Sequence, residues 1–371
     1  MRPKPFFIVN PVSGGGRTRG KLPRLRAAIE GHGFEPDLVL TERPWHAYEL
    51  ARAAIEQGHD TLVACGGDGT VFEVANAIFD LEAAARVRLG TIPLGTGKDV
   101  AKCLGMPRPA AALRAIAAGA ERAIDVGRVE SVDAYGQPIV RHFLLEASAG
   151  WIPEISHSIP RILKRLGDTS PYVVTAFVKM LGPMNRYFTL EIDGLEYHAP
   201  YNSISAHNMA FWGGDLEVAP GADPADGLLD AIRWGPLGRL MVLRAIQGQR
   251  QGGRHLAIEG VDHHAAKRVR LDSPKRTHLE LDGEAAGFLP AALEVIPHAL
   301  RFLAPSQRNG RRRAPRVDGR EVTASRYLNT GSRFSTNARA ASRKSSDETS
   351  FQCRSVSSSR YSLNSMRSAA T

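Results

Sequence analysis

The stretch TLVACGGDGTVFEVAN, residues 61–76, decides how the first part of this chain folds. An apolar run, Thr61–Cys65, ends in the glycine turn Gly66–Thr70, and residues with helical spacing follow from Val71. A strand that leads through a glycine-rich turn into a helix is the repeating unit of a parallel sheet flanked by helices. The stretch therefore predicts an α/β domain.

The same succession occurs on both sides of this stretch, because apolar runs and patterns with helical spacing alternate along the first third of the chain. The expected strands are 6–9, 38–40, 61–65 and 87–92, and the expected helices are 21–30, 47–57 and 71–79. Two more glycine turns, 13–16 and 95–97, follow expected strands. We predict an N-terminal α/β domain over residues 1–121.

The pattern changes near Arg122, where strand-like runs begin to follow one another. These runs are 124–129, 139–145, 187–192, 203–209, 228–232, 268–271, 278–281 and 293–296. Two helical patterns, 155–181 and 237–251, interrupt them. Successive strands joined by turn signals predict a second domain, mostly antiparallel and β-sandwich-like, over residues 122–304.

The formal charge of +10 is concentrated in residues 305–371, which hold thirteen Arg and one Lys against four acidic residues. The first 304 residues are therefore formally neutral. The last segment is rich in Ser and Arg and has few apolar residues, so we expect a disordered tail. Such a tail either binds an anionic membrane surface or is a solvated appendage. We do not expect a nucleic acid partner.

Composition and cysteine content place the chain among proteins of a reducing compartment. Three cysteines are too few and too scattered for a disulfide framework or a zinc site. No stretch approaches the roughly 18 apolar residues of a spanning helix, and the apolar run before Asn10 is too short for a signal peptide. We expect a cytoplasmic protein whose membrane contacts are peripheral.

The three glycine turns predict a phosphate-binding cradle. In an open α/β sheet, ligands bind at the carboxyl ends of the strands, where glycines let backbone N–H groups approach phosphate oxygens. Each turn taken alone also has a purely conformational explanation. The Walker A pattern fails around Gly97-Lys98-Asp99, since Ile92 stands where a glycine is required, and no G-x-G-x-x-G follows Val9.

As a set, these motifs resemble the diacylglycerol kinase catalytic-domain family, which includes bacterial soluble lipid kinases and the sphingosine and ceramide kinases. The matching elements are Asn10-Pro11 with Ser13-Gly14, Thr41-Glu42, residues 66–76, Ile92–Thr96 with Asp99, Gly150, residues 226–230, and Asp282-Gly-Glu284. They keep the family order from about residue 10 to 300. The Gly-Gly-Asp-Gly-Thr element alone is shared with NAD kinases.

The resemblance implies a lipid kinase that uses ATP and Mg²⁺ in a cleft between the two domains. Its acceptor would be a hydroxyl of a membrane lipid, diacylglycerol or a related one. The residues it assigns to ATP are Asn10, Pro11, Ser13, Gly14, Thr41, Gly66, Gly67, Asp68, Gly69, Thr70, Glu73 and Thr96. It also implies a structural Mg²⁺ at Asp226 and the main-chain carbonyls of Asp223 and Leu228.

The resemblance assigns Asp68, Asp282 and Glu284 to phosphoryl transfer, one of them as the general base. Elementary chemistry agrees, because the reaction needs a carboxylate toward the attacking hydroxyl and oxygen ligands for a hard cation. Each has a structural alternative. Asp68 is a good helix cap, and Asp282-Gly283 is a common hairpin turn.

Two positions depart from the family pattern, which usually has Asn where this chain has Lys98 and Leu145. They leave open a weakened enzyme, or a degenerate kinase fold that senses nucleotide or lipid as a regulatory protein. NAD kinase is a further alternative, against which the segments Asp226–Asp230 and Asp282–Glu284 stand. Oligomeric state and the identity of the lipid are open.

Two further features have ordinary explanations. The segment Trp151–Leu181 mixes apolar and basic residues, which suits an interfacial helix or plain core packing. The histidines at 207, 255, 263 and 264 show no ligand spacing, and we expect them in surface or loop positions.

Overall fold

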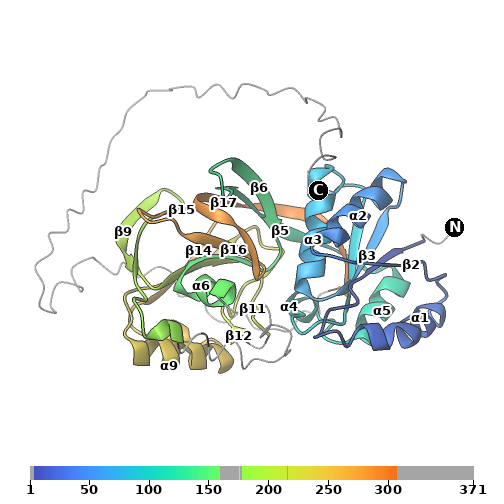
Figure 1. Ribbon diagram of the computed structural model, residues 1–371, viewed down its shortest axis with the longest axis horizontal. Helices are drawn as coiled ribbons and strands as arrows, with labels where there is room; N and C mark the ends of the chain where they lie inside the picture. The colour runs from blue at the N-terminus through green and yellow to red at the C-terminus, as the bar shows by residue number, and fades with distance from the viewer. Residues whose placement is uncertain (1–3, 159–174, 176–177, 215, 307–371) are drawn as a thin grey trace, which may run out of the picture. The chain divides into compact units, whose positions relative to one another are not determined.

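The computed structural model describes residues 4–158, 175, 178–214 and 216–306, all of which belong to one unit of the chain (Figure 1). In this part of the protein, no helix is long and apolar enough to span a membrane. The expectations for residues 159–174 and for the tail from residue 307 onward lie outside the described residues.

The N-terminal domain is built on four parallel strands in the order β4-β3-β1-β2. The strands are β1 Phe6–Val9, β2 Leu38–Leu40, β3 Thr61–Gly66 and β4 Arg88–Pro93. The helices are η1 Arg19–Lys21, α1 Leu22–Glu30, α2 His46–Glu56, α3 Asp68–Asp80, α4 Asp99–Cys103 and α5 Pro109–Ala118. These bounds closely match the elements expected from the sequence.

Both faces of this sheet are buried, which explains why its strands are apolar along their whole length. Along β3, Leu62 and Ala64 pack in the core that contains α2 and α3. Val63 and Cys65 pack on the other face, with α1 and α5. The strands run in one direction, so the turns that follow β1, β3 and β4 meet at the same edge.

The second domain consists mostly of antiparallel strands. Its long strands are β5 Glu121–Val132, β6 Pro138–Phe143, β7 Glu146–Gly150, β8 Arg186–Ile192, β9 Leu195–Tyr201, β10 Ser203–His207, β13 Leu229–Trp234, β14 Val261–Ala266, β15 Arg268–Asp272, β16 His278–Leu281 and β17 Glu284–Leu303. A small hairpin consists of β11 Phe211–Trp212 and β12 Leu216–Glu217. The helical elements are α6 Trp151–Ser158, α9 Arg239–Arg250 and η2 Arg254–Ala257.

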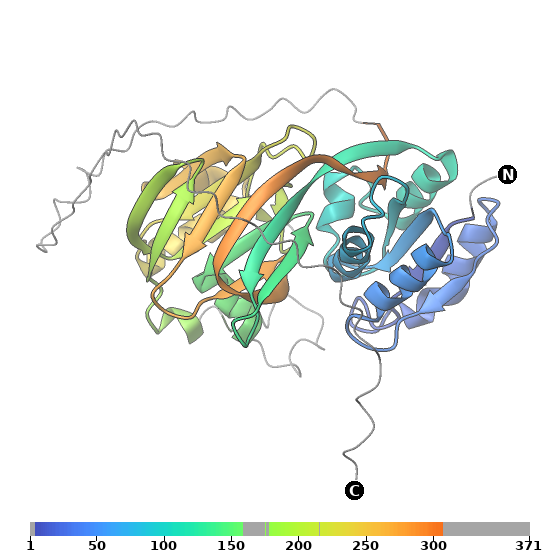
Figure 2. The same cartoon turned by 90° about the horizontal axis from the view of Figure 1, so that it is seen from above.

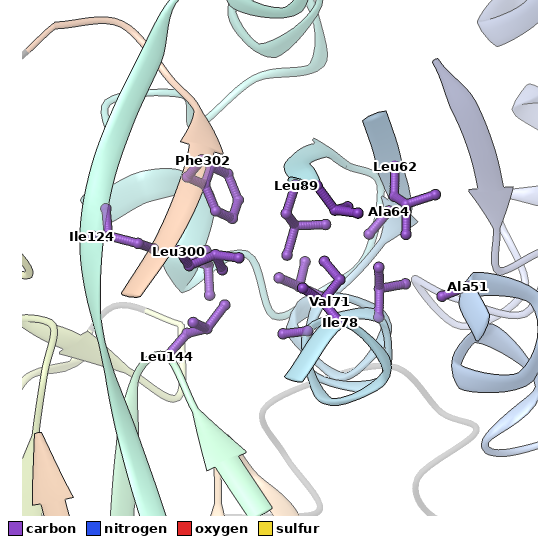
Figure 3. Close-up of a cluster of buried hydrophobic side chains, with 14 of the residues drawn as sticks. Ala51, Leu62, Ala64, Val71, Ile78, Leu89, Ile124, Leu144, Leu300 and Phe302 are labelled. Atoms are coloured by element: carbon purple, nitrogen blue, oxygen red, sulfur yellow. The ribbon is translucent and has the colours of Figure 1, made fainter. Parts of the chain in front are cut away.

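Strand β17 joins the two domains. It is 20 residues long and pairs with β5, β15 and β16, and near its end it pairs in parallel with β4. Figure 2 shows β17 and β5 passing together from the β-rich domain toward the N-terminal one. In Figure 3, Leu300 and Phe302 of β17 and Ile124 of β5 point toward Leu89 of β4, and all four are fully buried. One hydrogen-bonded sheet therefore runs through both domains.

Within the second domain, strands β16, β7, β10 and β13 present two chemically different faces, because successive side chains alternate. Ala147, Ala149, Ile204 and Ala206 pack in an apolar core with residues of β8 and β15. The opposite face carries buried polar side chains. Glu146, Ser148, His207, Asp230 and Glu280 are buried there, and Ser205 is half-buried.

The expectation for the histidines was wrong for two of them. His207 is buried inside β10 and His255 is buried in η2. His263 lies in β14, where its Nε2 is 2.6 Å from the Asp230 carboxylate. The burial of His207 could not be predicted from its polar sequence neighbours, because it depends on the strand register that pairs it with Glu146 on a covered face of the sheet.

Candidate active site

The three glycine turns pack against one another at the edge where β1, β3 and β4 end. Gly95 N–H donates to the Gly66 carbonyl (2.9 Å), and Asp68 N–H donates to the Gly97 carbonyl (3.3 Å). A Cβ on Gly95 would lie 2.6 Å from the Cα of Gly67, a separation that real Cβ atoms do not adopt. The turns after β3 and β4 therefore need glycine for close approach, and together they form one surface.

The first turn joins the same surface. Asn10 Nδ2 donates to Thr70 Oγ1 (3.4 Å), and Ser13 Oγ donates to the Asn10 carbonyl (2.9 Å). Gly14 has a φ of 63°, and a Cβ there would lie 3.0 Å from the Leu94 carbonyl oxygen. Asn10, Ser13 and Gly14 in the turn after β1 thus lie next to the turns after β3 and β4. These three residues and Thr70 are all predicted to bind ATP.

Asp68 is the first residue of α3, at the carboxyl end of β3. Its buried carboxylate accepts hydrogen bonds from the N–H groups of Asp99 (2.9 Å) and Val100 (3.1 Å) at the start of α4. Burial raises the pKa of Asp68 to about 6, against the lowering effect of these two donors, and the charge of Asp282 raises it further. The group thus titrates near neutrality.

Asp282 lies in the turn between β16 and β17, with a φ of 51° and Gly283 after it, as the hairpin alternative expected. Its carboxylate accepts three backbone hydrogen bonds, from Leu144 (2.9 Å), Leu145 (2.7 Å) and Glu146 (3.0 Å). Burial nevertheless raises the pKa of Asp282 to about 6, and the nearby Glu284 carboxylate adds to the rise. Asp282 can therefore both form the hairpin turn and act as a titrating carboxylate in the site.

Glu284 brings a third carboxylate to the same place. A Cβ on Gly69 would lie 2.6 Å from Glu284 Oε1, so this carboxylate covers the first turn of α3, next to Asp68. Glu284 is exposed, whereas Asp68 and Asp282 are buried. The three predicted catalytic residues, from opposite domains, therefore converge beside the glycine turns.

Leu145 and Lys98, the two departures from the family pattern, lie differently in this site. The Leu145 side chain is buried in the core of the N-terminal domain, while its backbone N–H donates a hydrogen bond to the Asp282 carboxylate. Lys98 is exposed immediately before α4. The missing Asn side chain at 145 therefore leaves the position of Asp282 intact.

Other residues predicted to bind ATP have more varied settings. Glu73 accepts hydrogen bonds from the N–H groups of Trp45 and Ala47, both at 3.0 Å, at the start of α2. Thr41 is buried and its N–H donates to the Val9 carbonyl. Pro11 is buried, and Thr96 is exposed at the end of the third turn. The observed hydrogen bonds give Glu73 a structural task, holding the loop before α2.

The residues predicted to hold a structural Mg²⁺ share one loop. Asp226 Oδ1 accepts a hydrogen bond from Leu228 N–H (3.1 Å), and Asp223 forms an ion pair with Arg122 (3.1 Å). In the described part of the protein, no group of three or more His, Cys, Asp or Glu side chains is arranged to hold a metal ion. A site here would rest on one carboxylate and two carbonyls, as the prediction has it.

Asp125, which the sequence did not single out, fixes that loop. Its fully buried carboxylate accepts hydrogen bonds from Gly227 N–H (2.6 Å) and His298 N–H (2.7 Å). Its own N–H donates to the Pro224 carbonyl (2.7 Å). The only sequence signal was an acidic residue inside the apolar run Ile124–Val126.

The buried polar face of the second domain begins beside Asp282, whose N–H donates to the Glu146 carbonyl (3.0 Å). A cavity of about 20 Å³ lies on this face, lined in part by Glu146, Ser148 and His207. Burial raises the pKa of Glu146 well above its usual range and lowers the pKa of His207 to about 3. His207 is therefore neutral at pH 7, burial favours the protonated, uncharged form of Glu146, and the cavity has room for about one water molecule.

Comparison with known proteins agrees with this architecture. Residues 4–129 match the diacylglycerol kinase catalytic domain, and residues 154–304 match the YegS C-terminal NAD kinase beta sandwich-like domain. Diacylglycerol kinases of two Staphylococcus aureus strains, RF122 / ET3-1 and MRSA252, are each 28% identical to this chain over 313 residues, covering 82% of it and 94% of their own length.

Solved structures share the fold. A crystal structure of a diacylglycerol kinase from Bacillus anthracis str. Sterne aligns with a TM-score of 0.59 at 21% identity, covering 82% of this chain and 97% of that one. A second crystal structure from the same organism gives a TM-score of 0.66 at 23% identity, covering 82% and 96%. The predicted fold, an α/β domain followed by a β-sandwich-like domain, is confirmed. The carboxylates of both matched domains lie at one site: residues 4–129 form a diacylglycerol kinase catalytic domain, and residues 154–304 form the YegS-type C-terminal domain that follows it.

Proposed function

We propose that this protein is an ATP-dependent lipid kinase that transfers the γ-phosphoryl group to a hydroxyl of a membrane lipid, diacylglycerol or a related one. The observation that carries the proposal is the pair Asp68 and Asp282. These buried carboxylates come from different domains, lie close enough for one charge to raise the other's pKa, and border the glycine turns. The match to the diacylglycerol kinase catalytic domain and the similarity to diacylglycerol kinases support the same activity.

The glycine turns are the nucleotide side of the proposed site. They bring backbone N–H groups and the N-terminus of α3 to one edge of the sheet, an arrangement that favours phosphate oxygens. Gly66, Gly67, Gly95 and Gly97 leave no side chain between the backbone and a ligand. The turns thus suit the phosphates of ATP.

The carboxylate pair is the proposed proton acceptor. A base with a pKa near 6 is mostly ionised at pH 7 and still basic enough to accept a proton from a hydroxyl. We assign this role to one member of the pair. As the lipid oxygen bonds to the γ-phosphorus, the bond from that phosphorus to the β–γ bridging oxygen breaks, ADP leaves, and the hydroxyl proton passes to the carboxylate.

The residues present also fit a Mg²⁺ ion delivered with the nucleotide. Mg²⁺ is commonly held by one or two carboxylates together with substrate phosphates, and Asp68 and Glu284 lie beside the turns where those phosphates would bind. When bound, the ion would neutralise charge on the phosphates. Asp226, with the carbonyls of Asp223 and Leu228, is a separate proposed structural site.

The regulatory alternative predicts a protein that binds ligands without chemistry. It rests on Lys98 and Leu145. The structure keeps all three carboxylates together despite these two residues, which favours the enzyme.

The test is transfer of labelled γ-phosphate from ATP and Mg²⁺ to diacylglycerol, monoacylglycerol, ceramide, sphingosine and phosphatidylglycerol in mixed micelles, with NAD as a soluble control. A labelled lipid supports the proposal and names the substrate class. Labelled NAD alone would replace it with NAD kinase activity. ATP binding without any labelled product would favour the regulatory alternative.

A further inference from the structure

Helix α9 presents an apolar face that nothing described in the structure covers. Leu240 is 62% exposed and Leu243 is 43% exposed, whereas Val242 and Ala245 are buried on the opposite side of the helix. The two leucines are three residues apart, so they lie on one face of the helix. In Figure 1, α9 lies at the border of the β-rich domain, with this domain on one side only.

The same region is strongly basic. Between Gly235 and Ile258 the chain has four arginines, at 239, 244, 250 and 254, and neither Asp nor Glu. All four are exposed, and none forms an ion pair with a carboxylate of the described residues. No carboxylate of the described residues therefore neutralises these arginines in an ion pair, although the first 304 residues as a whole are formally neutral.

A neighbouring segment extends the apolar face. Arg239 Nε donates to the Met180 carbonyl (2.6 Å), which ties the chain around Met180 to the start of α9. Leu181, next to it, is 74% exposed. We call this surface the α9 patch; it consists of Leu181, Arg239, Leu240, Leu243, Arg244 and Arg250.

We propose that the α9 patch docks the protein on an anionic bilayer. The leucines enter the boundary between head groups and acyl chains, and the arginines contact lipid phosphates. Exposed leucines interspersed with arginines are the composition of helices that lie in a membrane interface. Lipid phosphates supply the negative charge that the patch lacks.

A second copy of this chain fits the patch poorly as an occupant. A two-fold symmetric contact through α9 would bring its arginines against those of the partner, and like charges across an interface oppose association. An acidic bilayer has no such conflict. The inference rests on charge and exposure and is independent of the phosphoryl transfer proposed above, so its test needs no nucleotide.

The experiment reads insertion at single positions of the full chain. A polarity-sensitive fluorophore is attached at Leu240→Cys or Leu243→Cys in a background that carries Cys103→Ala and Cys353→Ser, so that the one native thiol left, Cys65, is buried. The matched control is Leu195→Cys on β9, whose leucine is also 62% exposed. With phosphatidylglycerol–phosphatidylcholine vesicles, we expect a blue shift and quenching by bromolipids at 240 and 243 and neither at 195.

A second measurement tests the arginines by vesicle sedimentation. Each arginine near an anionic surface strengthens binding about fivefold, so Arg244→Gln with Arg250→Gln should weaken it about 25-fold. The control pair Arg24→Gln with Arg26→Gln, exposed on α1, should change it little. Activity toward a short-chain soluble lipid should be equal in all variants, which separates loss of docking from loss of catalysis.

Three results would overturn the proposal. These are no spectral change at 240 and 243 with anionic vesicles, equal weakening by both arginine pairs, and a spectral change that follows protein concentration without vesicles. The last would identify the α9 patch as a contact between copies.

Discussion

The surroundings of Asp68 and Asp282 make both carboxyl groups weaker acids than usual, and the pH dependence of the reaction rate should reveal this. The pKa of each is raised to about 6, first of all by burial. Because the base must be ionised, we expect kcat/KM for the lipid to fall as pH drops through about 6 and to level off above pH 7. Asn in place of whichever of Asp68 and Asp282 is the base should lower kcat by about 10²–10⁴-fold. A flat profile between pH 5 and 8 would contradict the assignment.

The same pKa values affect stability with a defined sign. An acid whose pKa is raised from 3.8 to about 6 on folding holds its proton more tightly in the folded state. Its contribution to stability is complete below pH 4 and is lost as pH rises through about 6. For one group the loss amounts to roughly 3 kcal/mol. Asp282→Asn lacks this titration, so the wild-type free energy of unfolding should decline relative to that of the variant between pH 4 and pH 7 in urea titrations.

Glu73 shows where residue patterns were informative and where they were not. Its place after the Gly-Gly-Asp-Gly-Thr motif led to a predicted ATP contact, yet its oxygens accept hydrogen bonds from Trp45 and Ala47. We expect Glu73→Ala to lower the free energy of unfolding by about 2 kcal/mol, because two donors lose a charged acceptor. Thermal denaturation measures this. An unchanged melting temperature combined with weaker ATP binding would restore the predicted role.

At the scale of elements, a loop can depend on one buried side chain far away in sequence. Asp125 on β5 holds Gly227 and His298 through its carboxylate. Asp125→Ala leaves both N–H groups without their acceptor and opens a hole, so we expect a loss of about 3 kcal/mol in unfolding free energy. Asp226→Ala, with its partly exposed side chain, is the matched control and, measured without Mg²⁺, should cost only about 1 kcal/mol. Equal losses would contradict the anchoring role of Asp125.

Sequence patterns located elements well where one periodicity was sustained. The parallel strands and helices of the first domain match closely, because strands buried on both faces are apolar runs between glycine turns. Strands β9 and β14 escaped notice since polar residues, including His263 and His264, break their alternation. The cavity lined by Glu146 and His207 was also missed, because only cross-strand register places these two side chains opposite each other.

At the scale of the whole molecule, the shared sheet should make the two domains unfold together. β17 pairs with strands of both domains, and its last residues pack in the N-terminal core. We expect one cooperative transition in urea. Trp45 reports on the first domain, and the buried Trp151 and Trp234 report on the second. In variants that retain the tryptophans of one domain only, the midpoint of urea unfolding followed by tryptophan fluorescence should equal the midpoint followed by circular dichroism. Different midpoints for the two domains would show that they unfold independently.

The arrangement also has a consequence for how the chain is made. Strand β4 has β3 on one side and β17 on the other, and β17 is the last strand of the described chain. While the ribosome synthesises the intervening residues, the completed first domain carries an open sheet edge at β4, and such edges pair readily with other chains. The nascent protein therefore remains open to mispairing until residues 301 and 302 leave the exit tunnel and close that edge.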